Sequence, residues 1–381
     1  MRLFLLSSLL FSLLSVDGYK FLAYMPMFGK SHITFMSKIT HVLIDAGHEV
    51  VVLSPLLQES MGRPGKLLPK GVRIIEIPQC EISRQADAEW FREGGTVTNF
   101  WKSTGFFDLM STFWSMINSW VEQCKATLDT PGLIEQLKAE KFDAAYTEVM
   151  DMCSLGLFHV LEIEKTAITQ SLSFIMKGFP FTGAPDAPSY VPGMMVDYGE
   201  KMNFVERFWN TFPHFTTPIF QKQMTAPYQA VFEERFKNFP ALATIVPNVS
   251  LVFLNSEPLI DFPRPTSHKI VEIGGISVSG GHKPLDKDWD ELFTRRPQTV
   301  LLSFGTVALA HLMPEEYKQT IRETFRKFPN VTFVWKYEKP EHEIGRGINN
   351  IVPVTWVPQN DFLYDRRLSC FITHGGQGST T

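Results

Sequence analysis

The chain of 381 residues has few cysteines and no excess of charge of either sign. Its four cysteines, at positions 80, 124, 153 and 370, form neither a CxxC pair nor a metal-ligand spacing. This pattern excludes a zinc module and a disulfide-dense scaffold, and it leaves one or two bridges open. Lys and Arg number 36 and Asp and Glu 40, so the basic excess usual in nucleic-acid binders is missing. We therefore expect no nucleic-acid partner and no metal site.

Two further signals are missing. After the N-terminus there is no uninterrupted apolar run of about 18 residues, so the sequence predicts no membrane-spanning helix. There is also neither a GxGxxG nor a GxxxxGKS motif, which are the fingerprints of dinucleotide-binding and P-loop proteins. An NAD-dependent oxidoreductase is therefore the weakest of the functional hypotheses. Hydrophobic residues make up 44%, which is enough for a sizeable core and argues against disorder.

The first 18 residues have the pattern of a secretory signal peptide. Arg2 precedes an apolar run from Leu3 to Leu14, and small residues precede a cut after Gly18. The alternative, a buried first strand, is weaker because a better strand begins at Tyr19. Transport into the secretory pathway gives meaning to two glycosylation sequons, at Asn248 and Asn330.

Two α/β regions follow. Residues 19–275 begin with a strand at 19–25, a helix with Ser31 as its N-cap and Gly47 as its stop, and a strand at 48–53. Further strands are predicted at 72–77, 142–147, 167–170, 250–255 and 270–273, and helices at 86–127, 152–163 and 204–212. Residues 276–297 read as a linker.

The second region, 298–381, has predicted strands at 299–304, 331–336, 351–356 and 368–373, and helices at 314–328 and 361–365. Strands that alternate with helices predict two doubly wound parallel sheets, one in each region. In such sheets ligands bind at the carboxyl ends of the strands, so a ligand between two facing sheets is expected.

The first sheet offers one histidine and two acids at these strand ends. His32 begins the first helix, whose N-terminus favours the neutral ring that a general base needs. Glu148 and Asp151 follow the strand at 142–147, so either carboxylate can bond the second nitrogen of His32. The alternatives are a structural histidine and two helix-capping acids that face water; His41 and His48 are weaker candidates.

The second sheet offers hydroxyls, glycines and a tryptophan at its strand ends. Hydroxyls and bare backbone N–H groups suit phosphate, and an indole can stack on a base, although a lone Trp is usually core. The residues in question are Ser303, Gly305, Thr306, Trp356, Gln359, His374, Gly376, Gly378 and Ser379.

Five motifs together carry a family resemblance. They are Gly29-Lys-Ser-His32, the segment 142–148, Leu302-Ser-Phe-Gly-Thr306, Trp356-Val-Pro-Gln-Asn-Asp361 and Phe371-Ile-Thr-His-Gly-Gly376. With them the chain resembles the UDP-glycosyltransferases of the GT-B fold, and most closely the animal UDP-glucuronosyltransferases of the endoplasmic reticulum. The resemblance covers the whole chain and implies two facing Rossmann-like domains, the second incomplete, and a location in the lumen or membrane of that compartment.

The resemblance also implies roles for these residues. His32 matches the general base, and Glu148 stands where the family has Asp, so Glu148 and Asp151 compete as its partner. Trp356 matches the residue that stacks on uracil, and Gln359 lies in the stretch that meets uridine. The remaining matches are to positions that contact the phosphates: His374, Gly376, Gly378 and Ser379, and the turn of Ser303, Gly305 and Thr306.

The implied reaction is a direct displacement with inversion. His32 takes the proton of an acceptor hydroxyl, and UDP leaves from the opposite face of the sugar. Glucuronic acid is slightly preferred over glucose as the sugar, the acceptor is a small lipophilic molecule, and no cofactor is needed because the UDP-sugar is a co-substrate. An aromatic segment lines the acceptor site or is ordinary helical core: Trp90, Phe91, Phe100, Trp101, Phe106, Phe107, Phe113, Trp114 and Trp120. Residues 204–220 are a candidate for lying on a membrane surface, and homo-oligomerisation is left open.

The family pattern continues beyond Thr381. An Asp-Gln pair that reads the sugar, a membrane-spanning helix and a basic tail belong to that continuation. We therefore expect this polypeptide to be a fragment or a short form, unstable or inactive on its own, with membrane association through the missing helix. The alternative is a catalytically inactive lumenal protein with a binding or regulatory role.

Overall fold

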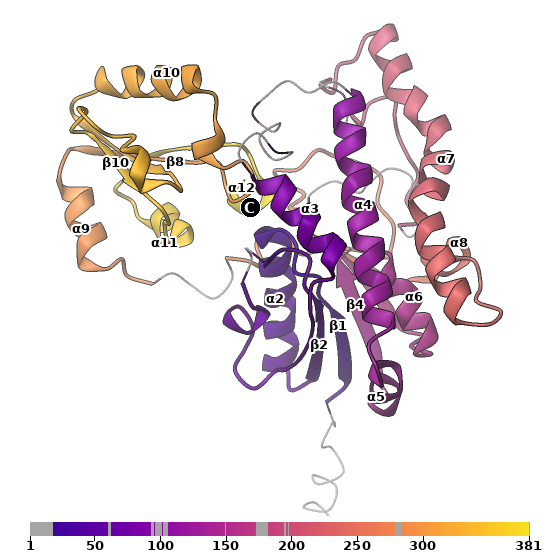
Figure 1. Cartoon of the computed structure of the whole chain (residues 1–381). Helices are drawn as coiled ribbons and strands as arrows, with labels where there is room; N and C mark the ends of the chain where they lie inside the picture. The colour runs from indigo at the N-terminus through magenta and orange to yellow at the C-terminus, as the bar shows by residue number, and fades with distance from the viewer. Residues whose placement is uncertain are drawn as a thin grey trace, which may run out of the picture.

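Two parallel β-sheets, each covered by helices, make up the protein (Figure 1). The structure is a computed structural model that describes residues 18–59, 62–92, 95, 101, 106–148, 150–172, 182–193, 196, 198–278 and 283–380. The predicted signal peptide lies outside these residues except for Gly18. None of the helices in the described ranges combines the length and the apolar character that crossing a membrane requires.

The first sheet has seven strands in the order β3-β2-β1-β4-β5-β6-β7, and every pairing is parallel. Its strands are β1 (Lys20–Tyr24), β2 (Glu49–Pro55), β3 (Arg73–Ile77), β4 (Ala144–Glu148), β5 (Thr166–Gln170), β6 (Leu251–Leu254) and β7 (Ile270–Glu272). The chain order reverses between β1 and β4. In sheets of this kind the reversal opens a crevice at the carboxyl ends of the two strands.

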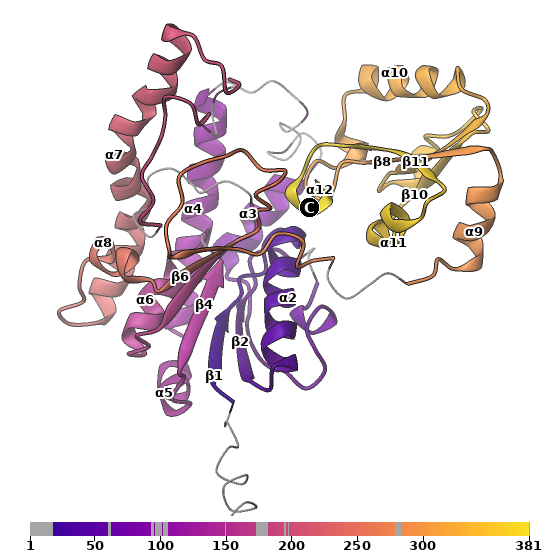
Figure 2. The ribbon, with the colours of Figure 1, turned by 180° about the vertical axis from the view of Figure 1, so that it is seen from behind.

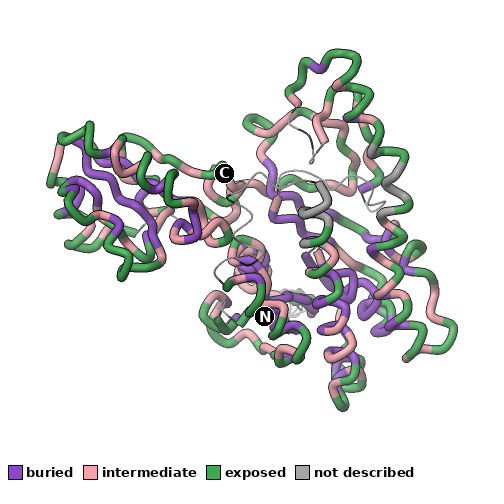
Figure 3. The backbone as a smooth tube through the Cα atoms, turned by 45° about the horizontal axis from the view of Figure 1, so that its top comes forward, coloured by how far each residue is buried: buried purple, intermediate pink, exposed green. Residues whose placement is uncertain are grey.

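Helices cover both faces of the first sheet. The face with α2 (Lys30–Asp45) packs Ile33 and Met36 against Val50 and Val52. The other face is covered by α4 (Phe106–Leu128), α5 (Leu133–Ala139), α6 (Cys153–Val160), α7 (Phe204–Arg235) and α8 (Leu242–Ile245), while α3 (Glu81–Phe91) packs on α4. The central strands β1, β2, β4 and β5 are largely buried (Figure 3), as expected for a parallel sheet that is covered on both faces.

The second sheet has the order β10-β9-β8-β11 and is also entirely parallel. Its strands are β8 (Gln298–Ser303), β9 (Val331–Lys336), β10 (Ile351–Val354) and β11 (Leu368–Thr373). One face carries α10 (Glu315–Arg326), and the other carries α9 (Lys287–Thr294) and α11 (Gln359–Tyr364), as Figure 2 shows. The predicted doubly wound fold is therefore confirmed. β11 is the most exposed strand, whereas β9 is buried throughout.

The last helix, α12 (Gln377–Thr380), lies beside the N-terminal end of α2 (Figures 1 and 2). There the side-chain amide of Gln377 donates a hydrogen bond to the carbonyl of Asn255 over 3.0 Å. Short 3-10 helices lie in the connections: η2 (Pro64–Lys66), η4 (Val246–Asn248), η5 (Ala310–Leu312) and η6 (Pro340–His342).

The second half of the predicted linker, residues 276–297, contains the helix α9 in the structure. The side chain of Asp286 caps this helix by accepting a hydrogen bond from the backbone N–H of Trp289. Leu292 and Phe293 are then buried against Val334 and Phe362. The polar residues that suggested a linker are the exposed side of an amphipathic helix.

The helix predicted at 204–212 is much longer in the structure. α7 continues through three prolines to Arg235, because Met224, Tyr228 and Phe232 in its second half are buried in the core. Its first half is exposed and strongly apolar, with Phe204 at 85% and Phe215 at 72% relative exposure. The proposed position of residues 204–220 on a membrane surface stays a prediction.

Candidate active site

His32 lies at the point where the chain order of the first sheet reverses. β1 ends at Tyr24, and α2 begins at Lys30, so the ring sits in the first turn of the helix. Ser31 was predicted as the N-cap, but Gly29 takes this position with φ of 60° and makes no side-chain cap. A Cβ on Gly29 would lie 2.9 Å from Cδ2 of His32, so the ring packs directly over the glycine. Glycine is needed here both for its backbone conformation and for this close approach.

Glu148, the last residue of β4, is the carboxylate that the structure brings to His32. Its Oε1 lies 2.9 Å from Nδ1 of His32, and both side chains are largely buried. β1 and β4 are adjacent parallel strands, so His32, which follows β1, and Glu148, which ends β4, lie at the same edge of the sheet. The partner of His32, which the sequence left open, is therefore Glu148 in this structure.

Two residues at the carboxyl end of β5 hold Glu148 in place. Thr169 donates its hydroxyl to Oε2 over 2.9 Å, and the backbone N–H of Ser171 donates to Oε1 over 3.2 Å. The Ser171 hydroxyl lies 2.7 Å from Nδ1 of His32. Because a carboxylate only accepts hydrogen bonds, this surrounding favours the proton on Nδ1 and leaves the lone pair on Nε2. That is the tautomer a general base needs.

Thr169 and Ser171 are not among the site residues predicted from the sequence. The signal was available, because both belong to the end of the next parallel strand after β4. The rule that places ligands at the carboxyl ends of strands applies to β5 as well as to β1 and β4.

Asp151 does not reach His32. Its Oδ2 accepts a hydrogen bond from the Tyr24 hydroxyl over 3.0 Å, and its Oδ1 accepts one from the backbone N–H of Cys153 over 2.9 Å. Burial raises the pKa of Asp151 from 3.8 to about 6, despite the opposing effect of these hydrogen bonds. Burial and the nearby charge of Asp151 also raise the pKa of Tyr24 and of Tyr228 well above their usual range.

The raised pKa of Asp151 predicts a pH-dependent loss of stability. The folded protein binds this proton more tightly than the unfolded chain, so the free energy of unfolding falls as pH rises from about 4 to about 6. The loss amounts to at most about 3 kcal/mol and is complete above that range. The side chain in Asp151→Asn is neutral at every pH, so this variant should not show the loss of stability between pH 4 and pH 6. Denaturant unfolding of both proteins at pH 4 and pH 7.5 measures the difference, and parallel pH dependences would contradict this assignment.

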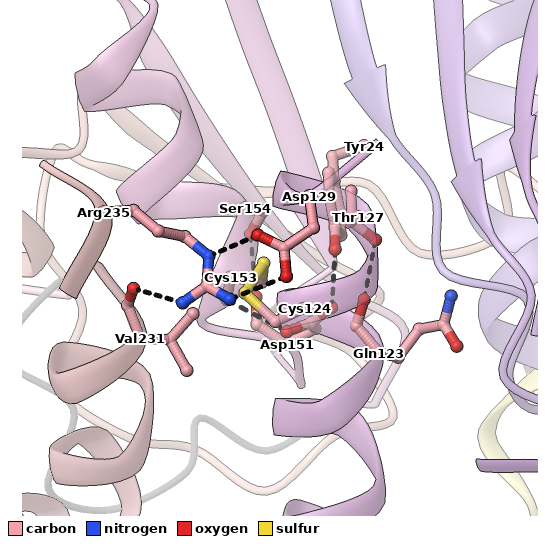
Figure 4. Close-up of a disulfide and its surroundings, with 10 residues drawn as sticks. All are labelled: Tyr24, Gln123, Cys124, Thr127, Asp129, Asp151, Cys153, Ser154, Val231 and Arg235. Carbon is pink, nitrogen blue, oxygen red and sulfur yellow. Dashed lines mark hydrogen bonds and ion pairs between the residues drawn. A yellow bond between two sulfur atoms is a disulfide. The ribbon is translucent and has the colours of Figure 1, made fainter. Parts of the chain in front are cut away.

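A disulfide fixes the segment that contains Asp151. Cys124 of α4 is bonded to Cys153 of α6, while Cys80 and Cys370 are free. Figure 4 shows the bond between the Tyr24–Asp151 pair and the ion pair of Asp129 with Arg235. The disulfide and the Tyr24 hydroxyl therefore hold the segment between β4 and α6, while the ion pair of Asp129 with Arg235 joins the ends of α4 and α7.

The second sheet presents two glycine turns at its own point of reversal, between β8 and β11. Gly305 follows β8 with φ of 76°, and Gly375 follows β11 with φ of 72°. The His374 ring lies between them: a Cβ on Gly305 would be 2.8 Å from its Cε1, and one on Gly376 would be 2.5 Å from its Nε2. The hydroxyl of Ser303 is buried beside this turn without a hydrogen-bond partner among the described residues.

A buried lysine contacts the Gly305 turn. The buried Lys336 donates from Nζ to the carbonyl of Gly305 over 2.6 Å and pairs with Glu338 at 3.1 Å. Partial burial, together with the charge of Lys336, lowers the pKa of His374 and favours its neutral ring. Free backbone N–H groups, a spare hydroxyl and a nearby cation are the features that bind a phosphate.

The remaining predicted residues of the second sheet lie around the same turns. Trp356 follows β10 and is 52% exposed, and Gln359 begins α11 and donates to the Ser379 hydroxyl over 3.0 Å. Thr306 is half-buried in the Gly305 turn, and Gly378 lies in α12 with open space around it.

Some residues of the aromatic segment lie in the core of the first domain, and others contact the region of the second sheet. Trp120 is buried and meets Phe28 edge-on at 4.8 Å between ring centres, and Trp90 packs on Leu312 of the second sheet's region. Trp101 donates from its indole N–H to the carbonyl of Leu309 over 2.8 Å. Phe100 and the side chains of Phe106, Phe107 and Phe113 lie outside the described residues.

Comparisons with known proteins point to one family. The family model described as "UDP-glucoronosyl and UDP-glucosyl transferase" matches residues 21–380. A Caenorhabditis elegans protein named "Putative UDP-glucuronosyltransferase ugt-55" is 30% identical over all of this chain and 73% of its own length. Mouse UDP-glucuronosyltransferase 1A7 is 26% identical over 92% of this chain and 64% of its own.

A solved structure supports the fold. The crystal structure titled as that of the glycotransferase of kitacinnamycin superposes with a TM-score of 0.54 at 14% identity, over 95% of this chain and 77% of that one. At this identity the likeness concerns the GT-B fold alone. Together with the family match, these findings show that the chain belongs to the UDP-glucuronosyl and UDP-glucosyl transferase family.

Proposed function

We propose that the protein transfers glucuronic acid or another hexose from a UDP-sugar to a hydroxyl group of a small lipophilic acceptor, with inversion and with His32 as the general base. The observation that carries this proposal is the contact of His32 Nδ1 with Glu148 Oε1 at 2.9 Å. It leaves Nε2 free to accept a proton, in a family whose members use UDP-sugars.

The proton follows a short path in this mechanism. The acceptor hydroxyl gives its proton to Nε2 of His32 while its oxygen attacks the anomeric carbon. Glu148 stabilises the imidazolium that forms, and Thr169 and Ser171 hold its carboxylate in place by donating hydrogen bonds to it. UDP departs from the opposite face of the sugar.

The donor is held by the turns of the second sheet. Trp356 offers its exposed ring to uracil, Gln359 meets the uridine, and the phosphates lie on Ser303, Gly305, Thr306, His374, Gly376, Gly378 and Ser379. Preorganised donors aimed at a developing charge contribute on the order of 3 kcal/mol each. No protein-bound cofactor takes part.

Apolar neighbours of His32 favour a lipophilic acceptor. A hollow beside the ring, with a volume of about 10 Å³ that corresponds to about one water molecule, is lined by Phe28, Met36, Leu57 and Trp120 together with the carboxylates of Glu148 and Asp151. An acceptor panel of small alcohols and phenols therefore tests the function: UDP release is measured with UDP-glucuronic acid and with UDP-glucose, for the unaltered chain and for His32→Ala. Equal turnover by both proteins would remove His32 from the mechanism, and UDP binding without turnover would favour the non-catalytic binding protein.

Gly305→Ala is expected to weaken UDP binding by about tenfold, because it strains the turn by 1–2 kcal/mol and pushes a Cβ to within 2.8 Å of His374. Gly347 offers a matched control: it has the same φ of 76° but nothing within 4 Å of its Cβ position. Calorimetric titration with UDP should find Gly347→Ala unchanged. A similar loss in both variants would mean that only backbone strain was measured.

We further propose that the protein is a glycoprotein of the endoplasmic reticulum lumen. Disulfides persist in oxidising compartments, and Asn248 and Asn330 are both exposed. Expression in secretory cells should give two N-glycans, seen as two steps in gel mobility on partial digestion with peptide-N-glycosidase F. Asn248→Gln and Asn330→Gln should each remove one step, and a product without glycans would contradict this location.

A further inference from the structure

One contact joins the two sheets at the candidate site. Nζ of Lys30 lies 3.4 Å from the ring centre of Trp356. Lys30 is the first residue of α2, two positions before His32, and Trp356 follows β10 of the second sheet. The contact therefore links the side of the proposed base to the ring that is proposed to stack on uracil.

In the described part of the chain, Lys30 lacks the carboxylate partner that the nearby Lys336 has. Lys336 pairs with Glu338, whereas Lys30 has no carboxylate partner among the residues that the structure describes. Lys30 is also half-buried, and burial together with the charge of Lys336 lowers its pKa. A half-buried ammonium group without a counter-charge, close enough to Lys336 for the two charges to repel each other, is suited to an anion.

A base that stacks on the side of Trp356 occupied by Lys30 competes with the amine for that face of the ring. A cation over an indole at a partly exposed site corresponds to about two- to fivefold in affinity. A base stacked on an aromatic ring corresponds to about 5- to 150-fold. The base therefore displaces the amine, which must then find another partner within the reach of its side chain.

We propose that Lys30 is a donor-binding cation with two positions: it rests on Trp356 in the free protein and moves to an anionic group of the UDP-sugar when uracil stacks there. This inference rests on the proposed function. The anion is either a phosphate of the UDP moiety or the carboxylate of glucuronic acid, and both would pair with an ammonium group in the same way. Lys30 thereby couples the arrival of the donor to the first turn of α2, where His32 lies.

Calorimetric titrations of Lys30→Met with uridine and with UDP test the proposal. Without the amine, uridine no longer has to displace a cation, so its affinity should rise about two- to fivefold. If the anion is a phosphate, UDP loses its ionic contact and its affinity should fall about tenfold or more. If the anion is the carboxylate of glucuronic acid, the same fall is expected for UDP-glucuronic acid. Opposite signs for uridine and for the anionic ligand are the signature, since a purely structural role would move both in one direction.

Two control variants sharpen the result. Lys30→Arg keeps the charge and should bind the donor within a few-fold of the unaltered chain. Lys38→Met makes the same substitution two turns further along α2 and should change neither ligand. Equal losses for UDP-glucose and UDP-glucuronic acid identify a phosphate as the anion, and a loss confined to UDP-glucuronic acid identifies its carboxylate.

The proposal is overturned if Lys30→Met binds uridine and all three UDP ligands as the unaltered chain does, or shifts them all in one direction. In both cases the unaltered chain still binds UDP and the proposed function stands. If the unaltered chain binds neither UDP nor a UDP-sugar, the proposed function fails, and this inference fails with it.

Discussion

Replacing His32 by alanine should lower kcat for sugar transfer by about 10²–10⁴-fold, the usual contribution of a general base. The Kd for UDP should stay within about twofold of that of the unaltered chain. The turns proposed to hold the phosphates belong to the second sheet and do not contact the His32 ring. Stopped-time assays of UDP release and calorimetric titration with UDP measure the two quantities separately.

His41 provides the matched control for this variant. It lies on the same helix, and its Nδ1 contacts the backbone carbonyl of Ser37 at 2.8 Å instead of a carboxylate. His41→Ala should therefore leave kcat within about twofold, the change expected of a residue that takes no part in the transition state. If both histidine variants lose activity equally, the effect reflects helix stability and His32 has no catalytic role.

Replacing Glu148 should separate its charge from its positioning role. In Glu148→Gln the backbone N–H of Ser171 still requires an oxygen at the Oε1 position, so the amide keeps the proton of His32 on Nδ1. Only the negative charge is lost, and kcat should fall by about 10–100-fold, as for a lost charge-assisted hydrogen bond. Glu148→Ala also frees the ring and should approach the activity of His32→Ala.

The double variant completes this experiment. Because both residues act as one unit, adding Glu148→Ala to His32→Ala should cost little further activity. Additive losses would mean that Glu148 acts independently of His32. A Glu148→Gln variant as inactive as Glu148→Ala would mean that the tautomer is not held in the way described, and Ser171→Ala would then be the next variant to measure.

The position of the site was predictable from the sequence because it follows from the topology of parallel sheets. His32, Glu148, Ser303 and His374 were found by one rule, that the loops after parallel strands meet at one edge. Order reversals between β1 and β4 and between β8 and β11 bring these loops together in pairs. The rule needs only strand assignments, which the apolar runs supplied.

The choice between Glu148 and Asp151 was not predictable. The two acids are three positions apart after the same strand, and the sequence says nothing about the direction of the loop. In the structure this direction is set by distant residues: Tyr24 and the backbone of Cys153 take Asp151 into the core, close to the disulfide with Cys124. Four cysteines allow several pairings, so this bond was equally hidden.

The length of α7 shows where local signals fail. Pro213 ends a helix by local rules, yet α7 continues to Arg235. Burial of Tyr228 and Phe232 and the capping box at Asn203 supply the stability that the prolines remove. The contact of Lys30 with Trp356 was hidden for a similar reason, because it depends on how two separately predicted sheets are placed.

The most direct test of a single displacement at His32 is the configuration of the product. The unaltered chain is incubated with the α-linked UDP-sugar that it accepts and a phenol, and the anomeric proton of the product is observed by nuclear magnetic resonance. One displacement by the hydroxyl that His32 deprotonates must invert the anomeric carbon, so we expect a β-linked product. An α-linked product would require two displacements or attack from the same face, and would contradict a single displacement at His32.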